Sequence, residues 1–190
     1  MHISDGIINW QVCLAADVLS IAVIHFSSKK IEAQEIPKMG MTAAALFAAS
    51  LIHLPIGGTS LHLGLFGIAG IILKKRAFPV VFTALLFQSL IFQHGGLISI
   101  GINTINMASG AYLAWIIWKL TINNYLKSFI AGFFGIIAPL ILMAAEFYFS
   151  GYGKGIIYLL NLYLIAAVSE GIITIFVISF IQKIKPEIIT

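Results

Sequence analysis

Long apolar stretches run along the whole chain, separated by short segments that contain polar residues, glycine or proline. A helix needs roughly 20 apolar residues to cross a bilayer, and most of these stretches approach that length. They are too long and too uniformly apolar for the alternating pattern of an outer-membrane barrel. The pattern predicts an all-α integral membrane protein of about seven transmembrane helices. The expected spans are residues 7–26, 39–54, 62–73, 78–92, 104–120, 129–149 and 156–181.

Two of these stretches, residues 62–73 and 78–92, are short for a bilayer. Such segments can be tilted helices, or they can enter the membrane and turn back where protein lines a cavity. No long linker, charge run or low-complexity tract divides the sequence. We therefore expect a single transmembrane domain over residues 1–190.

The basic residues sort onto one side of these seven spans. If the chain crosses the membrane seven times, ten of the eleven Lys and Arg residues lie on one side of it. Lys154 alone lies on the other side. By the positive-inside rule the lysine-rich side is cytoplasmic, which predicts an outer N-terminus and a cytoplasmic C-terminus. The ten residues are Lys29, Lys30, Lys38, Lys74, Lys75, Arg76, Lys119, Lys127, Lys183 and Lys185.

The composition supports a membrane location and narrows the function. Hydrophobic residues make up 60% of the chain and charged residues only 9%, whereas a soluble domain carries about 25% charged residues. We expect a multi-pass protein of the inner or plasma membrane, with the lipid bilayer as its surroundings. The net charge of +4 then reports topology rather than nucleic-acid binding, and no GxxxxGK[ST] nucleotide motif occurs.

Four of the five histidines fall at the predicted outer face, namely His2, His53, His62 and His94. Histidine is the commonest metal ligand in proteins. A free terminal amine, the His2 amide nitrogen and the His2 imidazole can close two adjacent chelate rings on one ion. With one more imidazole they would form a square of nitrogens, which favours Ni(II) or Cu(II), and a strained version would take Co(II). The alternative is that His2 is simply a polar residue in a frayed terminus.

The next ligand should come from the loop at residues 54–63, where proline and two glycines interrupt the helical pattern. Thr59 and Ser60 can cap the following helix, which would place His62 in its first turn. His53 stands nine residues earlier, at the end of the preceding span. For both histidines the alternative is an interfacial ring bonded to a backbone carbonyl.

Several motifs resemble the CbiM/NikM family, the substrate-binding membrane subunit of energy-coupling-factor importers of cobalt and nickel. The opening MHISDG, the loop GGTSLHL, the stretch FQHGGLISIGINTINM and the segment SEGIIT followed by PE all match the family's motifs in order. The resemblance covers nearly the whole chain. It implies a bundle similar to other substrate-binding components, with the N-terminal segment folded into the site. Ser4 and Leu61 differ from residues common in relatives, which leaves the choice between cobalt and nickel open.

The resemblance also implies a set of metal ligands. The Met1 amine, the His2 amide and imidazole, and the His62 imidazole would bind one divalent ion, with His53 as a further candidate ligand. Asp5 would help fold the terminal segment over the site. The residues expected to surround and support these ligands are Asp5, Thr59, Ser60, His94, Asn103 and Asn106.

The function that follows is capture of Co(II) or Ni(II) at the outer face, for ATP-driven import. The chain is not expected to be an enzyme or to hold a permanent cofactor. Its expected partners are a transmembrane coupling subunit, two ATPase subunits and a small accessory membrane subunit. Two other functions stay open: an intramembrane hydrolase that uses Ser60, His62 and Glu170, and a passive metal channel or carrier. The sequence contains neither HExxH nor GxSxG, which are typical of hydrolases.

Overall fold

The structure is a computed structural model that describes residues 2–56, 59–153 and 155–189. Among these residues are seven α-helices, and their order and positions match the seven predicted segments. A two-stranded antiparallel hairpin lies between the second and third helices, which the all-α prediction missed. The elements are α1 (Trp10–Ser28), α2 (Glu35–Leu51), β1 (His53–Ile56), β2 (Thr59–His62), α3 (Phe66–Leu73), α4 (Ala77–Phe92), α5 (Ile100–Trp118), α6 (Asn124–Phe149) and α7 (Ile156–Ile184), with short 3₁₀ turns at Lys74–Arg76 and Pro186–Ile188.

Helix starts follow local side-chain chemistry where the connections are polar. Asn9 caps α1 by accepting the N–H of Gln11 on its side-chain oxygen, and Asn123 caps α6 through the N–H of Tyr125 in the same way. Such caps satisfy backbone donors that have no partner inside the helix. The apolar stretches that follow these caps form the long helices α1 and α6.

Within the described residues, α1, α5, α6 and α7 are long and apolar enough to cross a membrane. Large apolar side chains on these helices point outward, as in Phe149 (84% exposed), Ile157 (77%) and Phe176 (71%). An exposed apolar surface of this kind suits contact with lipid rather than water. The protein is therefore membrane-embedded, while the count of seven spans and the orientation of the termini stay predictions.

Helix α3 is a short buried segment. All eight of its residues are buried, and eight residues of α-helix extend only about 12 Å, well short of a bilayer core. It packs against α5 and α6, where an added Cβ at Gly67 would lie 2.6 Å from the Cα of Gly132. This close approach of two backbones places α3 in the middle of the molecule.

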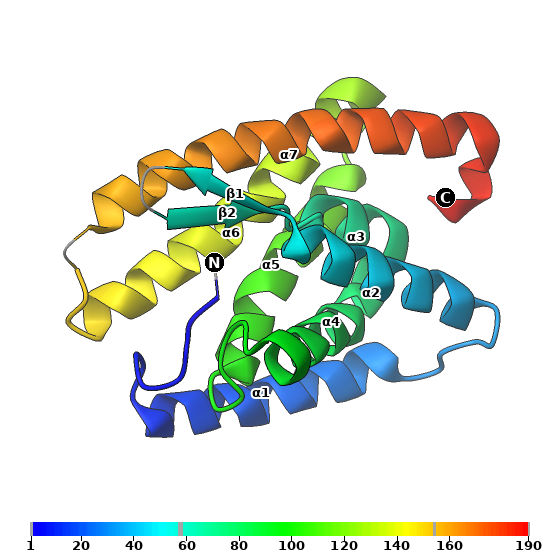
Figure 1. Cartoon of the computed structure of the whole chain (residues 1–190). Helices are drawn as coiled ribbons and strands as arrows, with labels where there is room; N and C mark the ends of the chain where they lie inside the picture. Colours follow the sequence, from blue (N-terminus) through cyan, green and yellow to red (C-terminus); the bar gives the residue numbers. More distant parts are fainter. Residues whose placement is uncertain (1, 57–58, 154, 190) are drawn as a thin grey trace.

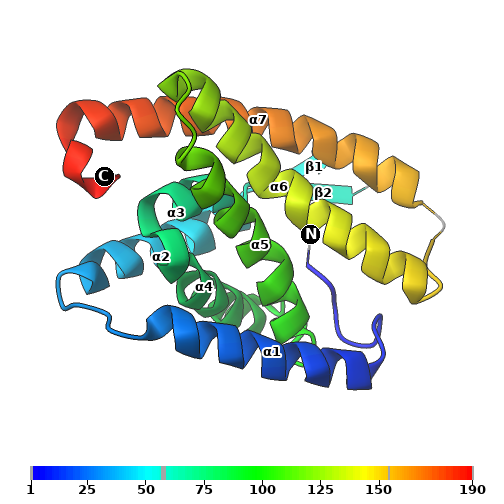
Figure 2. The same ribbon diagram turned by 180° about the vertical axis from the view of Figure 1, so that it is seen from behind.

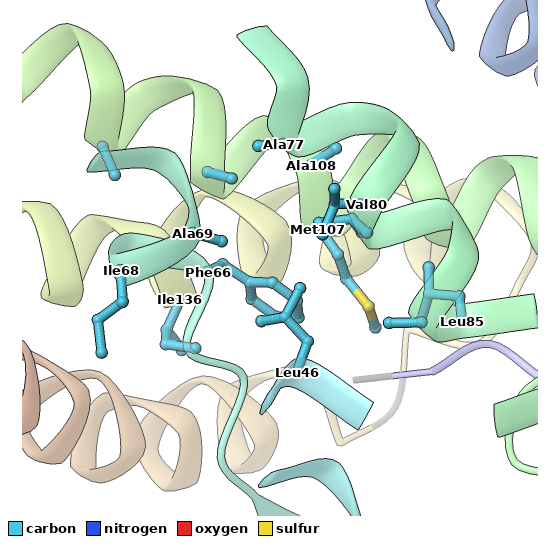
Figure 3. Packing of buried hydrophobic residues seen from close by; sticks show 14 of the residues in the cluster. Leu46, Phe66, Ile68, Ala69, Ala77, Val80, Leu85, Met107, Ala108 and Ile136 are labelled. Carbon is cyan, nitrogen blue, oxygen red and sulfur yellow. The ribbon is translucent and has the colours of Figure 1, made fainter. Parts of the chain in front are cut away.

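Helices α1 and α7 lie on opposite sides of the bundle, with α5 and α6 between them (Figures 1 and 2). Both views place the start of α1 and the end of α6 at one end of the bundle, and the end of α7 and the α1–α2 connection at the other. Buried apolar side chains from α2 to α6 fill the centre, including Leu46, Phe66, Met107 and Ile136 (Figure 3). This core lies between the end of the bundle where α1 starts and the end where α1 connects to α2.

Arg76 organises that second end. Its buried guanidinium donates to the carbonyl oxygens of Ser27 (2.6 Å), Lys29 (2.7 Å) and Lys30 (2.7 Å). It also makes a two-pronged ion pair with the Glu35 carboxylate, at 3.0 and 3.1 Å. These bonds from Arg76 lower the pKa of the Glu35 carboxyl below its ordinary value of 4.5. One side chain thereby fixes the turn that connects α1 to α2.

Candidate metal centre

The N-terminal segment is fastened to the start of α5. Ile3 is fully buried, and its backbone N–H donates to Asn103 Oδ1 at 2.8 Å, while Asn103 Nδ2 donates to the Ile3 carbonyl oxygen at 2.9 Å. The Ser99 hydroxyl donates to the same carbonyl oxygen at 2.7 Å. Because both backbone groups of Ile3 are paired, the position of the preceding residue, His2, is fixed as well.

Asp5 connects this segment to the loop between α4 and α5. Its carboxylate accepts the backbone N–H groups of Leu97 (3.0 Å) and Ser99 (2.9 Å). Gly96 lies against the same carboxylate, and a Cβ there would collide with it. The family resemblance implied that Asp5 helps to fold the terminal segment inward. The observed contacts connect Asp5 to the α4–α5 loop, and its role in metal binding stays a prediction.

His62 reaches the site from the hairpin rather than from a helix. It is the last residue of β2, paired in register with His53 of β1, and α3 begins only at Phe66. The expectation that His62 sits in the first turn of a helix is therefore wrong. Pairing between the strands satisfies the backbone groups of this loop, so no extra helical turn is needed. The expectation that Thr59 and Ser60 cap the next helix is also wrong, because both belong to β2 and the N-cap residue of α3 is Leu65. The side chains of residues 53–60 lie outside the described part, so the roles expected for His53, Thr59 and Ser60 at the metal stay predictions.

Glu170 holds the chain that follows His62. This carboxylate, 1% exposed at the middle of α7, accepts the backbone N–H groups of Gly64 and Leu65 at 2.5 and 3.0 Å. A charged or polar group at this depth is costly unless it has partners. The bonds therefore stabilise Glu170 and fix the hairpin exit at the same time.

His94 follows the end of α4. Gln93 closes the helix in a left-handed conformation (φ 52°), and the backbone N–H of His94 donates to the Gln88 carbonyl oxygen at 3.2 Å. This ending turns the chain back over the helix terminus. It brings the His94 side chain beside those of His2 and His62.

The three imidazoles converge at one point. One ligand atom from each of His2, His62 and His94 lies within 4.8 Å of the other two. The His2 and His62 rings are stacked with centroids 4.9 Å apart, and His94 stands edge-on to both, at 74° and 76°. His62 Nδ1 lies 3.3 Å from the Leu63 carbonyl oxygen, a contact that favours a proton on Nδ1 and leaves Nε2 able to bind an ion.

A cavity of about 290 Å³ opens beside the three rings. Its lining includes Met143, Phe147 and Tyr163 as well as His2 and His94. The lining is mixed, because Ser4, Gln93 and the histidines face the cavity together with apolar side chains. Several polar groups that converge on one cavity are typical of a small-ligand site. The cluster is thus accessible through a space larger than a bare metal ion requires.

The structure brings some predicted site residues together and separates others. His2, His62 and His94 form the cluster, and Asp5 and Asn103 hold the terminal segment beside it. Met1 lies outside the described residues. The Asn106 amide instead donates to the Glu146 carboxylate at 2.7 Å, between α5 and α6.

Three residues around the cluster were not predicted as part of a metal site: Ser99, Gln88 and Glu170. Each contacts a part of the site that is distant from it in the sequence, through a backbone group or through a buried side chain. Ser99 is the N-cap residue of α5 in the structure, but the predicted fifth span began at residue 104, so the sequence pattern did not single it out. The partners of Gln88 and Glu170 could be found only from the fold.

An apolar helical bundle with three imidazoles beside a cavity defines a membrane protein with a candidate transition-metal site. The chain belongs to the CbiM family, described as the cobalt uptake substrate-specific transmembrane region, which it matches over residues 2–188. It is accordingly a membrane component of cobalt or nickel uptake.

Individual relatives match nearly the full length of this chain. The chain is 31% identical to a protein of Haemophilus influenzae provisionally named a metal transport protein, over 99% of this chain and 96% of that one. It is 32% identical to a protein of Archaeoglobus fulgidus provisionally named a fused nickel transport protein, over 100% of this chain and 68% of that one. A crystal structure of a truncated transition metal transporter superposes with a TM-score of 0.85 at 25% identity, covering 96% of this chain and 99% of that chain.

Proposed function

We propose that this chain captures one Co(II) or Ni(II) ion from outside the cell, with His2 and His62 as its principal imidazole ligands. The observation that carries the proposal is the convergence of three histidines from three distant segments, with ligand atoms within 4.8 Å of one another. If each histidine were only a polar residue at a terminus or at the membrane interface, three imidazoles would have no reason to meet at one point in a largely apolar bundle. Membership of the CbiM family supports the same ions.

In this proposal the Met1 amine and the His2 amide nitrogen complete the donor set. Together with the His2 and His62 imidazoles they supply four nitrogens, a set that suits square-planar Ni(II) and can hold Co(II). His94, which stands edge-on to both rings, orients them. The ligands bind in their deprotonated forms, so affinity for the ion decreases as the pH falls.

Import would require partners that supply energy. The sequence has no phosphate-binding loop of the GxxxxGK[ST] type, so the proposal assigns ATP hydrolysis to two separate ATPase subunits. A transmembrane coupling subunit would transmit their motion, and a small accessory membrane subunit would complete the complex. The bundle would reorient in the inner or plasma membrane to release the ion inside.

The hydrolase alternative gains no support from the acid it requires. Glu170 would have to orient an imidazole, whereas its carboxylate accepts two backbone N–H groups beyond the hairpin. That arrangement suits a structural role beside His62.

The proposal is tested by metal binding to the purified protein in lipid nanodiscs, with an unmodified N-terminus. The variants are His2→Ala, His62→Ala, and a chain with one extra residue before Met1. His25→Ala is the matched control, because His25 lies on α1 and packs against Phe26. We expect about one bound ion per wild-type chain and per control chain, and none for the three test proteins.

Equal binding by His62→Ala and wild type would overturn the proposed site. Equal binding by the extended chain would remove the terminal amine from the ligand set and leave the imidazoles. Reconstitution with the ATPase and coupling subunits then separates an importer from a passive carrier, because only the importer requires ATP for uptake.

A further inference from the structure

A second, much smaller cavity lies on the inner side of the histidine cluster. Its volume is about 10 Å³, and His2 and His62 form part of its wall together with Gln88 and Ser50. The rest of the wall is apolar, and it includes Leu46, Phe66 and Leu85 from the buried core (Figure 3). A space of this size holds one water molecule when polar groups face it.

Gln88 is the polar group of this wall with unused bonding capacity. Its side chain is 3% exposed, and its Oε1 atom is buried and accepts no hydrogen bond from the described residues. Ser50 differs, because its hydroxyl donates to the Phe47 carbonyl oxygen at 2.7 Å. Buried amide oxygens in proteins are almost always paired with protein or with ordered water. A water in the cavity is the partner that fits.

The backbone of Gln88 is already part of the site. Its carbonyl oxygen accepts the N–H of His94 and that of Gln93, so Gln88 is held in place where α4 ends. A side chain so held can orient a water molecule without moving itself. The same residue therefore connects His94, through the backbone, to the cavity beside His2 and His62.

We propose that Gln88 holds one water molecule in this cavity, and that this water is an additional ligand of the ion, which favours Co(II) over Ni(II). The inference rests on the proposed function, because the ion is the one held by His2 and His62. Gln88 Oε1 accepts one O–H of the water, and the water oxygen then donates a lone pair to the ion.

Selectivity follows from the different needs of the two ions. Ni(II) is satisfied by four nitrogens in a square and gains little from a further oxygen. Co(II) readily takes a fifth ligand, so an oriented water adds to its binding. The partner that orients a ligand of a metal ion typically affects affinity by about 10- to 100-fold.

The test compares wild type with Gln88→Leu, which removes the amide and keeps a similar volume, in lipid nanodiscs. Ser50→Ala is the matched control, since it changes the same cavity at a hydroxyl that is already paired. The measurements are the affinities for Co(II) and Ni(II) alone and the visible absorption of the Co(II) form. If Gln88→Leu does not fold, Gln88→Met replaces it.

We expect Gln88→Leu to weaken Co(II) binding about 10- to 100-fold and to leave Ni(II) affinity nearly unchanged. Its Co(II) absorption spectrum should change in band position and intensity, because the loss of a ligand alters the coordination number. Ser50→Ala should match wild type in all three measurements. An unchanged ratio of the two affinities together with an unchanged Co(II) spectrum would overturn the proposal.

A second measurement detects the bound water directly in the wild type. Water enriched in ¹⁷O should broaden the electron paramagnetic resonance lines of bound Co(II), and the broadening should decrease in Gln88→Leu. Sharp lines in wild type would overturn the bound water. Failure of wild type to bind either ion would instead refute the proposed function, so the two failures are distinguishable.

Discussion

Replacing Asn103 with alanine tests whether the fastened N-terminal segment supports metal binding. In the wild type, the Asn103 amide pairs with both backbone groups of Ile3, next to His2. Asn103→Ala removes both of these bonds. The carbonyl oxygen of Ile3 keeps two other donors, the Ser99 hydroxyl and the Gly96 N–H, so the N–H of Ile3 is the group that loses its partner.

The size of the effect follows from that single orphaned donor. A buried N–H without an acceptor costs about 1–3 kcal/mol. The segment avoids this cost by lifting away to reach water, and the His2 nitrogens then leave the site. The free energy of metal binding is then less favourable by the same amount, because binding requires the segment to return to the site. Since about 1.4 kcal/mol corresponds to a tenfold change in affinity, we expect binding to weaken about 5- to 150-fold.

Isothermal titration with Ni(II) or Co(II) at constant pH measures this change. Thr104→Ala is the control, because Thr104 is a buried neighbour whose hydroxyl donates within its own helix, to Ile100. It should bind metal like wild type. Unchanged affinity in Asn103→Ala, with the control also unchanged, would show that the bonds to Ile3 do not support the site.

Two further substitutions test other contacts. Glu170→Leu should lower the melting temperature and weaken metal binding, because it leaves two buried backbone N–H groups without acceptors, at about 1–3 kcal/mol each. Glu170→Gln keeps an acceptor oxygen and should lose less stability. Equal losses of melting temperature in the two variants would contradict this explanation. Glu35→Gln should lower the melting temperature at neutral pH. The pKa of the Glu35 carboxyl is lowered by Arg76, so its stabilisation is present above pH 4.5 and is lost as the pH falls through the lowered value. The melting temperatures of wild type and Glu35→Gln should therefore converge in acid, and a constant gap would refute the assignment.

Much of the helical framework was predictable from the sequence. Apolar runs bounded by polar or glycine-rich segments gave seven helices in the right order, because a long apolar stretch has few alternatives to a helix in a membrane. Helix ends shifted by several residues where caps such as Asn9 and Asn123 define them. The hairpin was missed, since its four-residue strands are too short for an alternating pattern to be distinguished from a loop.

The candidate site was predictable only in part, for a physical reason. Charge and span counting sorted four histidines to one face, but they left both His53 and His62 as candidate partners of His2. The pairing of His2 with His62 came from the family resemblance. The equal standing of His94 in the cluster depends on how α4 ends, with Gln93 in a left-handed conformation. The contacts of Glu170 and Gln88 depend on packing between helices far apart in sequence, and no local pattern carries that information.

The three imidazoles come from the terminal segment, the hairpin and the α4–α5 loop, and these segments meet only when the bundle is complete. An ion bound by His2 and His62 in the place that His94 helps to define is a ligand of the folded state alone. Mass action then shifts the folding equilibrium toward that state. At a hundredfold excess of free ion over its dissociation constant, the gain would be about 2.7 kcal/mol. The cargo would in this way act as a folding ligand, and a chain that carries an ion would resist unfolding and proteolysis better than an empty one.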